Sequence, residues 1–222
     1  FGSIEGDITL LDLVESTGTN SNQITTFDGT GLSGLTTLNL YNNPLTSFNG
    51  GDMVLIETLD FDLNLGGNQL ASFDGGNMIG LTSLNLAGNQ LTSFDGTGLL
   101  SLTSLNLGGN PLETFIGGDM GQIISLDFPG WNITTLTSFD GTGLSGLTGL
   151  YLGGSQLTSF DGTGLSGLTE LDLSYNPLTT FIGGDMGQIG FLDFDSWIIT
   201  TLETFDGTGL SGLTGLYLYN NP

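Results

Sequence analysis

The sequence contains no lysine, arginine, histidine or cysteine among its 222 residues. Without lysine or arginine, no side chain can pair with a phosphate, which excludes nucleic-acid binding and attachment to an anionic membrane through a basic face. Without cysteine or histidine, the chain can form no disulfide, no thiol nucleophile, no zinc site of His/Cys type and no histidine-dependent triad. Binding therefore has to use oxygen atoms and apolar groups.

The charge of the side chains is of one sign. The 23 acidic residues give a formal net charge of −23 at pH 7. These carboxylates must be screened by salt, spread out, protonated or bound to cations, because like charges repel and destabilise a compact chain. A trypsin-type protease, which needs lysine or arginine, finds no site. No segment reaches the roughly 18 apolar residues that a membrane-spanning helix needs.

What the sequence does contain is a repeat. A clean unit spans residues 81–99 and has the general form L-x-x-L-x-L-x-x-N-x-L-x-x-F-x-G-x-x-L. Self-similarity at a period of 20 to 50 residues indicates a solenoid of stacked coils. Phenylalanines at intervals of 21 to 25 residues mark the repeat: Phe27, Phe48, Phe73, Phe94, Phe115, Phe139, Phe160, Phe181 and Phe205.

The first eleven positions of this unit resemble the signature of the leucine-rich repeat family, L-x-x-L-x-L-x-x-N-x-L. The resemblance runs from about Leu10 to Asn221. It implies an α/β-type solenoid, mostly strand and loop, that forms a right-handed coil with a parallel sheet on its concave face and little regular helix. In an extended strand Leu84 and Leu86 point to one face and Asn85 to the other.

A longer repeat lies above the first. Coils of 21, 21 and 24 residues form a 66-residue cassette, and residues 115–138 and 181–204 share 17 of 24 positions. We expect residues 1–222 to be a single solenoid of about nine coils, cut from a longer array, because neither end has a convincing cap.

An asparagine recurs five positions before most of the phenylalanines. The resemblance implies an inward ladder, in which each amide hydrogen-bonds the backbone of a neighbouring coil, since a buried amide needs partners. Where Thr134, Ser155 or Thr200 replaces asparagine, fewer such bonds are available. The predicted ladder comprises Asn43, Asn68, Asn89, Asn110 and Asn176.

A second column lies at the centre of the leucine strand and faces outward. The resemblance implies that this face binds partners, and tyrosine beside Asp and Asn suits a carbohydrate or a protein loop. A polar face that meets only solvent is the alternative. The candidate binding residues are Asn85, Asn106, Asp127, Tyr151, Asp172, Asp193 and Tyr217.

Aspartates in the glycine-rich segment after each phenylalanine, such as Asp95 in FDGTG, allow two interpretations. The carboxylate caps the N–H groups of a turn, or it contributes to a Ca²⁺ site. Turn capping is the preferred interpretation, because aspartate is common in turns. The best candidate Ca²⁺ cluster is Asp172, Asp193 and Asp195; no other cofactor is expected.

A hydroxyl residue directly precedes each of the phenylalanines that mark the repeat, as Ser93 precedes Phe94. Such a row suits ice binding, hydrogen bonds between neighbouring coils, or O-glycosylation. The position before this hydroxyl residue is less regular, because it holds Ala71, Glu113 and Glu203 in three of the coils.

The carboxylates recur with the repeat, so no acid/base pair is marked out and we expect no catalysis. The sequence favours a non-catalytic, extracellular or cell-surface protein with a structural or adhesive role, such as a stalk or filament segment presenting a polar acidic face. Its partners would be a protein or glycan surface, or further copies of itself. The alternative is a recognition module for a protein, a glycan or ice.

Overall fold

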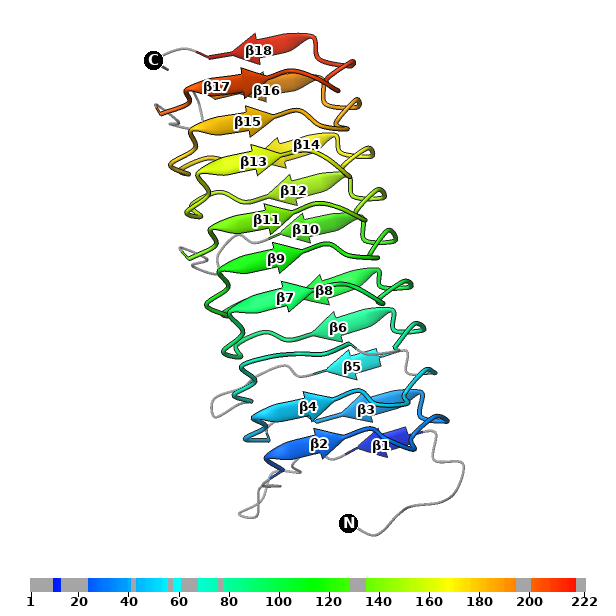
Figure 1. Ribbon diagram of the computed structural model, residues 1–222. Coiled ribbons are helices and arrows are strands. Elements are labelled where there is room, and N and C mark those ends of the chain that lie inside the picture. The colour runs from blue at the N-terminus through cyan, green and yellow to red at the C-terminus, as the bar shows by residue number, and fades with distance from the viewer. Residues whose placement is uncertain are drawn as a thin grey trace.

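The structure, a computed structural model, describes residues 10–12, 24–40, 43–55, 58–60, 68–75, 78–127, 135–194 and 201–218. Within these residues every regular element is a three-residue strand, and there is no helix. No helix suited to crossing a membrane is therefore found in this part of the chain. The chain winds into a stack of flattened coils, with two strands in most coils (Figure 1).

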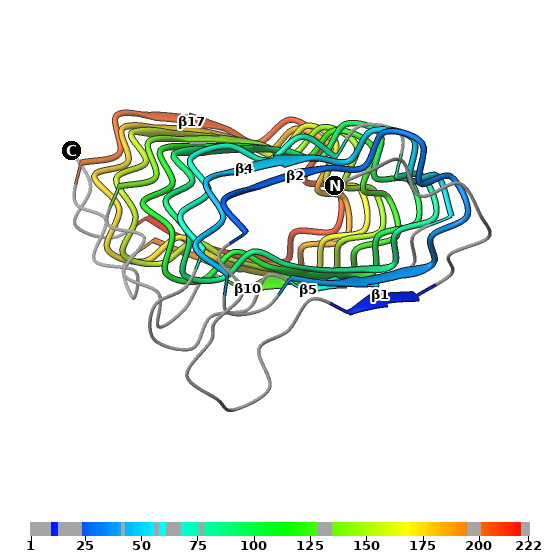
Figure 2. The same ribbon diagram turned by 90° about the horizontal axis from the view of Figure 1, so that it is seen from below.

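One strand of each coil contains the second leucine of the repeat, and these strands line one long side of the stack, here called the leucine face (Figure 2). They are β1 (Leu10–Asp12), β3 (Thr37–Asn39), β5 (Thr58–Asp60), β6 (Ser83–Asn85), β8 (Ser104–Asn106), β10 (Ser125–Asp127), β12 (Gly149–Tyr151), β14 (Glu170–Asp172), β16 (Phe191–Asp193) and β18 (Gly215–Tyr217).

The other strand is centred on the repeating phenylalanine and lines the opposite side, here called the phenylalanine face (Figure 2). These strands are β2 (Thr26–Asp28), β4 (Ser47–Asn49), β7 (Ser93–Asp95), β9 (Thr114–Ile116), β11 (Ser138–Asp140), β13 (Ser159–Asp161), β15 (Thr180–Ile182) and β17 (Thr204–Asp206).

All strand pairs are parallel, and equivalent repeat positions face each other. Leu84 pairs with Leu105 on the leucine face, and Phe94 pairs with Phe115 on the phenylalanine face. The leucine face contains the ladders β1-β3-β5-β6-β8, β10-β12-β14 and β16-β18. The phenylalanine face contains β2-β4, β7-β9-β11 and β13-β15-β17. A coil of the stack therefore hydrogen-bonds mainly to the coils before and after it.

The core follows from the alternation of side chains along each strand. Leu84 and Leu86 are 1% and 0% exposed, whereas Asn85 between them is half-buried. On the other side, the phenylalanines of successive coils stack in one continuous column, with ring centroids 5.3–6.4 Å apart. The predicted solenoid of parallel strands with little regular helix is confirmed.

Candidate functional site

The five ladder asparagines lie in the interior and are at most 4% exposed. Asn110 shows the arrangement most fully. Its Oδ1 accepts a hydrogen bond from the N–H of Leu91 in the preceding coil at 3.0 Å, and its Nδ2 donates to the carbonyls of Leu86 and Leu107 at 2.8 and 2.7 Å. All its bonds are made to backbone, so these amides join coils and are not available to a ligand.

On the phenylalanine face, the aspartates after the phenylalanines accept hydrogen bonds within their own turns. Asp161 Oδ1 accepts from the N–H and the hydroxyl of Thr163 at 2.9 and 2.7 Å, and Asp28 does the same with Thr30. The hydroxyl and N–H of Thr30 stabilise the charged form, and so lower the pKa of Asp28 below its ordinary value of 3.8. The turn interpretation of these residues agrees with this geometry.

The aspartates of the three GGDM segments connect coils instead. Asp185 Oδ2 accepts from the N–H of Gly164, 21 residues earlier, at 2.8 Å. Gly164 has a φ of +84°, a conformation that side-chain-bearing residues rarely adopt, and it turns its N–H toward the next coil. Two further pairs repeat the contact at 2.9 Å: Asp52 with Gly31, and Asp119 with Gly98.

Threonines at the coil edges bind the backbone of the preceding coil. On the phenylalanine side, the Thr179 hydroxyl donates to the carbonyl of Thr158 at 3.0 Å. On the leucine side, Thr169 donates to Thr148 in the same way at 3.0 Å. These hydroxyls act as structural donors between coils. Thr179 lies two positions before Phe181, so these contacts do not test the row of hydroxyl residues directly before the phenylalanines, which stays a prediction.

A hollow in the phenylalanine face lies between β11 and β13, where the ladder is interrupted. The hollow has a volume of about 320 Å³ and is lined by Phe139, Asp140, Gly141, Thr142, Asp161 and Thr163. Both carboxylates already accept N–H groups of their own turns.

The leucine face differs because it presents aromatic rings. Phe191 and Tyr217 are 56% and 54% exposed, and their ring centroids are 5.2 Å apart with the planes tilted by 50°. Gly215 lies opposite Phe191 in the β16-β18 ladder. A Cβ at Gly215 would approach Phe191 Cδ2 to 2.6 Å, so glycine allows the ring to lie against the sheet.

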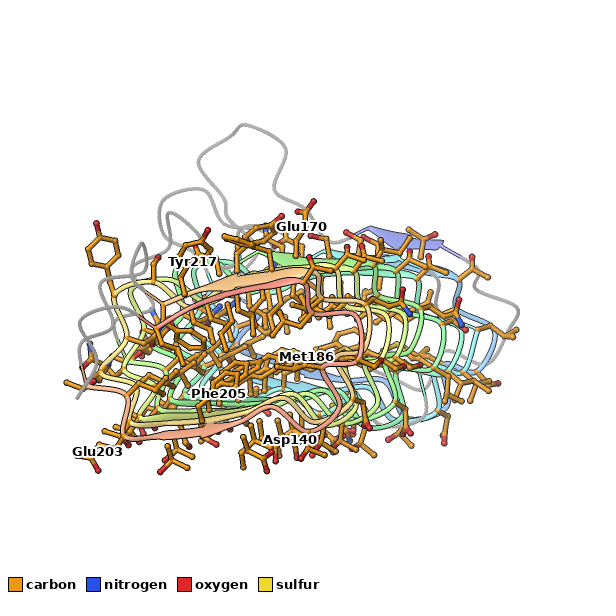
Figure 3. The ribbon with its side chains drawn as sticks, turned by 90° about the horizontal axis from the view of Figure 1, so that it is seen from above. Asp140, Glu170, Met186, Glu203, Phe205 and Tyr217 are labelled. Carbon is orange, nitrogen blue, oxygen red and sulfur yellow. The ribbon has the colours of Figure 1, made fainter. Side chains whose placement is uncertain are left out.

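A second aromatic contact lies in the coils before this pair. The hydroxyl of Tyr151 in β12 donates to Oε2 of Glu170 in β14. A Cβ at Gly149 would lie 3.3 Å from Tyr151 Cε2, so this ring also lies close over a glycine of the sheet. Glu170 and Tyr217 project from the same side of the stack, and Asp140 and Glu203 project from the opposite side (Figure 3).

The other predicted binding residues are placed as follows. Asn85 and Asn106 are half-buried, and each accepts an N–H of its own turn. Asp172 pairs in register with Tyr151 and accepts the N–H of Ser174 at 2.8 Å. Asp127 and Asp193 occupy the last positions of β10 and β16, and their side chains lie outside the described residues.

Asp195 lies outside the described residues as well, so the Ca²⁺ cluster of Asp172, Asp193 and Asp195 stays a prediction. Among the residues that the structure does describe, no group of three or more acidic side chains is arranged to hold a metal ion. Sequence reasoning missed Glu170. Its signal is the single acidic residue where the equivalent strand positions have Ser, Thr, Gly, Phe or Leu.

Comparisons with known proteins agree with the fold. Residues 167–189 match the family model described as Leucine Rich Repeat. The structure of TLR13 in its complex with ssRNA13 superposes with a TM-score of 0.62 at 22% sequence identity, over 90% of this chain and 32% of that one. The functional domain of InlJ from Listeria monocytogenes gives a TM-score of 0.42 at 22% identity, over 96% of this chain and 54% of that one.

No curated protein matches the chain. The chain spans about a third of TLR13 and about half of the InlJ domain. Residues 167–189 therefore carry the leucine-rich-repeat motif, and most of the chain has the same solenoid fold as the TLR13 structure, in agreement with the sequence resemblance. Stacked repeats of this kind create an extended surface.

Proposed function

We propose that the chain is a non-catalytic, extracellular adhesive module that binds a partner protein through its leucine face. The observation that carries this proposal is the difference between the two faces. Many polar groups of the phenylalanine face are used in turns and between coils, whereas the leucine face presents Phe191 and Tyr217 more than half exposed. Exposed aromatic side chains are enriched at protein–protein interfaces.

The proposal includes a structural role. The phenylalanine column, the asparagine ladder and the Asp185–Gly164 type of contact hold coils in one register, which supports a stiff spacer that carries the binding face. A location outside the cell is supported by the absence of lysine and arginine, because trypsin-type proteases have no cleavage site in the sequence. Antibody staining of intact against permeabilised source cells tests this location; staining only after permeabilisation would contradict it.

The absence of catalysis is supported by the environment of the carboxylates. Asp28, Asp161 and Asp185 accept hydrogen bonds from backbone N–H groups, within a turn for Asp28 and Asp161 and between coils for Asp185. No described pair of carboxylates differs from its repeat equivalents in a way that would assign one an acid role and the other a base role.

Adhesion of coated beads tests the binding role. Beads carrying the chain are flowed over immobilised proteins ranging from acidic to basic, and the retained fraction is measured. We expect retention by the wild type and by Glu203→Gln, which changes the opposite side, and loss for the double variant Phe191→Ala, Tyr217→Ala. Protease treatment of the target should abolish retention, and glycosidase treatment should not.

Equal retention of wild type and double variant, or no retention on any target, would contradict the proposal. Loss after glycosidase treatment alone would assign the face to a glycan instead of a protein.

A further inference from the structure

We propose that the leucine face between β12 and β18 binds an arginine-bearing, extended segment of its partner, an inference that rests on the proposed function and specifies its ligand. The surface is defined by Tyr151, Glu170, Phe191 and Tyr217, and is called the aromatic–acidic patch below. These four residues belong to β12, β14, β16 and β18, four successive strands of the leucine face.

The first argument is the geometry of the rings. Phe191 and Tyr151 both lie close over glycines, Gly215 and Gly149, so that their faces are presented along the sheet. Glycines at these two positions recur 66 residues apart, within the tripeptide Gly-Leu-Tyr of β12 and β18. The face of an aromatic ring carries negative electrostatic potential and attracts a cation placed above it.

The second argument is the carboxylate between the rings. Glu170 is exposed, and the hydroxyl of Tyr151 holds its Oε2 beside the first ring. The other carboxylate oxygen can accept a donor from outside. A guanidinium can stack on a ring and donate to such a carboxylate at once, which a compact ammonium group does less well.

The third argument is charge complementarity. The chain has no lysine, arginine or histidine, and its net charge is −23. No side chain of the chain itself can neutralise Glu170, so a complementary cation has to come from outside the chain, and an arginine of the partner supplies one. An acidic surface also steers a basic partner toward it and repels acidic ones.

The spacing defines the ligand further. Glu170 and Tyr217 lie on β14 and β18, two coils apart, and the ladder of the leucine face is interrupted between β14 and β16, so the two strands are at least about 10 Å apart. A peptide in the extended polyproline II conformation covers about 9 Å in three residues, and its side chains at positions i and i+3 lie on the same face. Two arginines three positions apart would therefore contact Glu170 with one guanidinium and the Phe191–Tyr217 pair with the other.

The test uses a labelled peptide with two arginines three residues apart, and matched peptides in which both are lysine or the uncharged isostere citrulline. Fluorescence anisotropy measures their affinity for the full chain. We expect the arginine peptide to bind more tightly than the lysine peptide, and the citrulline peptide at least tenfold more weakly. Affinity should fall as salt is raised, because the attraction is electrostatic.

Variants locate the site. The double variant Phe191→Ala, Tyr217→Ala should weaken the arginine peptide by roughly fivefold or more, as expected for two exposed cation–π contacts. Glu170→Gln and Glu203→Gln each remove one carboxylate, on opposite sides of the stack. Glu170→Gln should weaken binding about threefold or more and Glu203→Gln markedly less, since surface ion pairs are local at moderate salt. Unfolding midpoints confirm that each variant is folded.

Equal losses for the two glutamate variants would show diffuse attraction by net charge and would overturn the proposal. The proposal would also be overturned if the citrulline peptide bound as tightly as the arginine peptide. If beads still required Phe191 and Tyr217 for adhesion in that case, the arginine inference alone would fail. If neither assay responded to these residues, the adhesive function would fail with it.

Discussion

Asn89 Oδ1 accepts a hydrogen bond from the backbone N–H of Leu70, in the preceding coil, at 3.1 Å. Asn89 is 3% exposed, so its removal leaves the Leu70 N–H buried without this partner. We expect Asn89→Ala to lower the free energy of unfolding by about 2 kcal/mol. Urea denaturation measures the change. The adjacent exposed residue provides the control, because Gln90→Ala should change it by less than about 0.5 kcal/mol. Similar losses for both variants would contradict a ladder role.

The contact between Asp185 and Gly164 predicts a second effect on stability. Asp185→Ala removes the acceptor of the Gly164 N–H and should lower the free energy of unfolding by about 1 kcal/mol. It also removes one of 23 acidic residues, which relieves repulsion and opposes the loss. Glu203→Gln removes a charge without this contact, so thermal unfolding should show it equal to or slightly more stable than wild type. A loss of the same size in Glu203→Gln would remove the case for the contact.

The carboxyl of Asp28 predicts a pH effect. Its pKa is lowered from 3.8 chiefly by the hydroxyl of Thr30, so Asp28 stabilises the fold above its unfolded pKa. That contribution is lost as the pH falls through the lowered folded pKa. In Thr30→Ala the pKa of Asp28 should rise toward 3.8, as measured by ¹³C NMR titration. Thr46→Ala is the control, because that hydroxyl donates to the Thr25 carbonyl. An unchanged pKa in Thr30→Ala would refute the assignment.

The interrupted ladder between β11 and β13 predicts uneven hydrogen exchange. The N–H of Gly162 donates to the Ile182 carbonyl at 2.9 Å, and the described residues include no equivalent bond from Gly141 to the next coil. The stacked rings are also further apart here, at 6.3 Å between Phe139 and Phe160. The Gly141 amide should therefore exchange faster than the Gly162 amide in an NMR exchange experiment. Equal protection of the two would mean that the coils are joined as tightly here as elsewhere.

Because all charged side chains are acidic, we expect salt to stabilise the folded chain. Because side-chain charges in the chain only repel one another, raising NaCl from about 10 mM to about 150 mM should raise the melting temperature. Ca²⁺ at matched ionic strength should raise it further if Asp172, Asp193 and Asp195 bind the ion. Asp172→Asn should then remove the extra rise. A melting temperature that responds to neither Ca²⁺ nor a chelator would end the calcium hypothesis.

Much of the fold could be predicted because the repeat determines it locally. The alternation of Leu84, Asn85 and Leu86 follows from strand geometry alone, and the period of the repeat requires stacking. The strands of the phenylalanine face were not predicted, since three residues between turns give too short a pattern for sequence periodicity to detect. Their formation depends on the neighbouring coil, as in the pairing of Phe94 with Phe115.

The candidate site was predicted less completely. Tyr151 and Tyr217 were expected on the outer surface, and the structure adds Glu170, whose contact with Tyr151 joins residues 19 positions apart. The different roles of aspartates in similar glycine-rich segments also depend on distant partners: Asp161 binds its own turn, and Asp185 binds the coil before it.

By itself, the sequence determined that this protein is a solenoid of stacked repeats without basic residues, because repeat period and composition are properties of the chain. Only the tertiary structure decided which polar groups face outward, because whether a polar group finds a hydrogen-bond partner depends on the neighbouring coil. It thereby separated an internally bonded phenylalanine face from a leucine face with Phe191 and Tyr217 exposed.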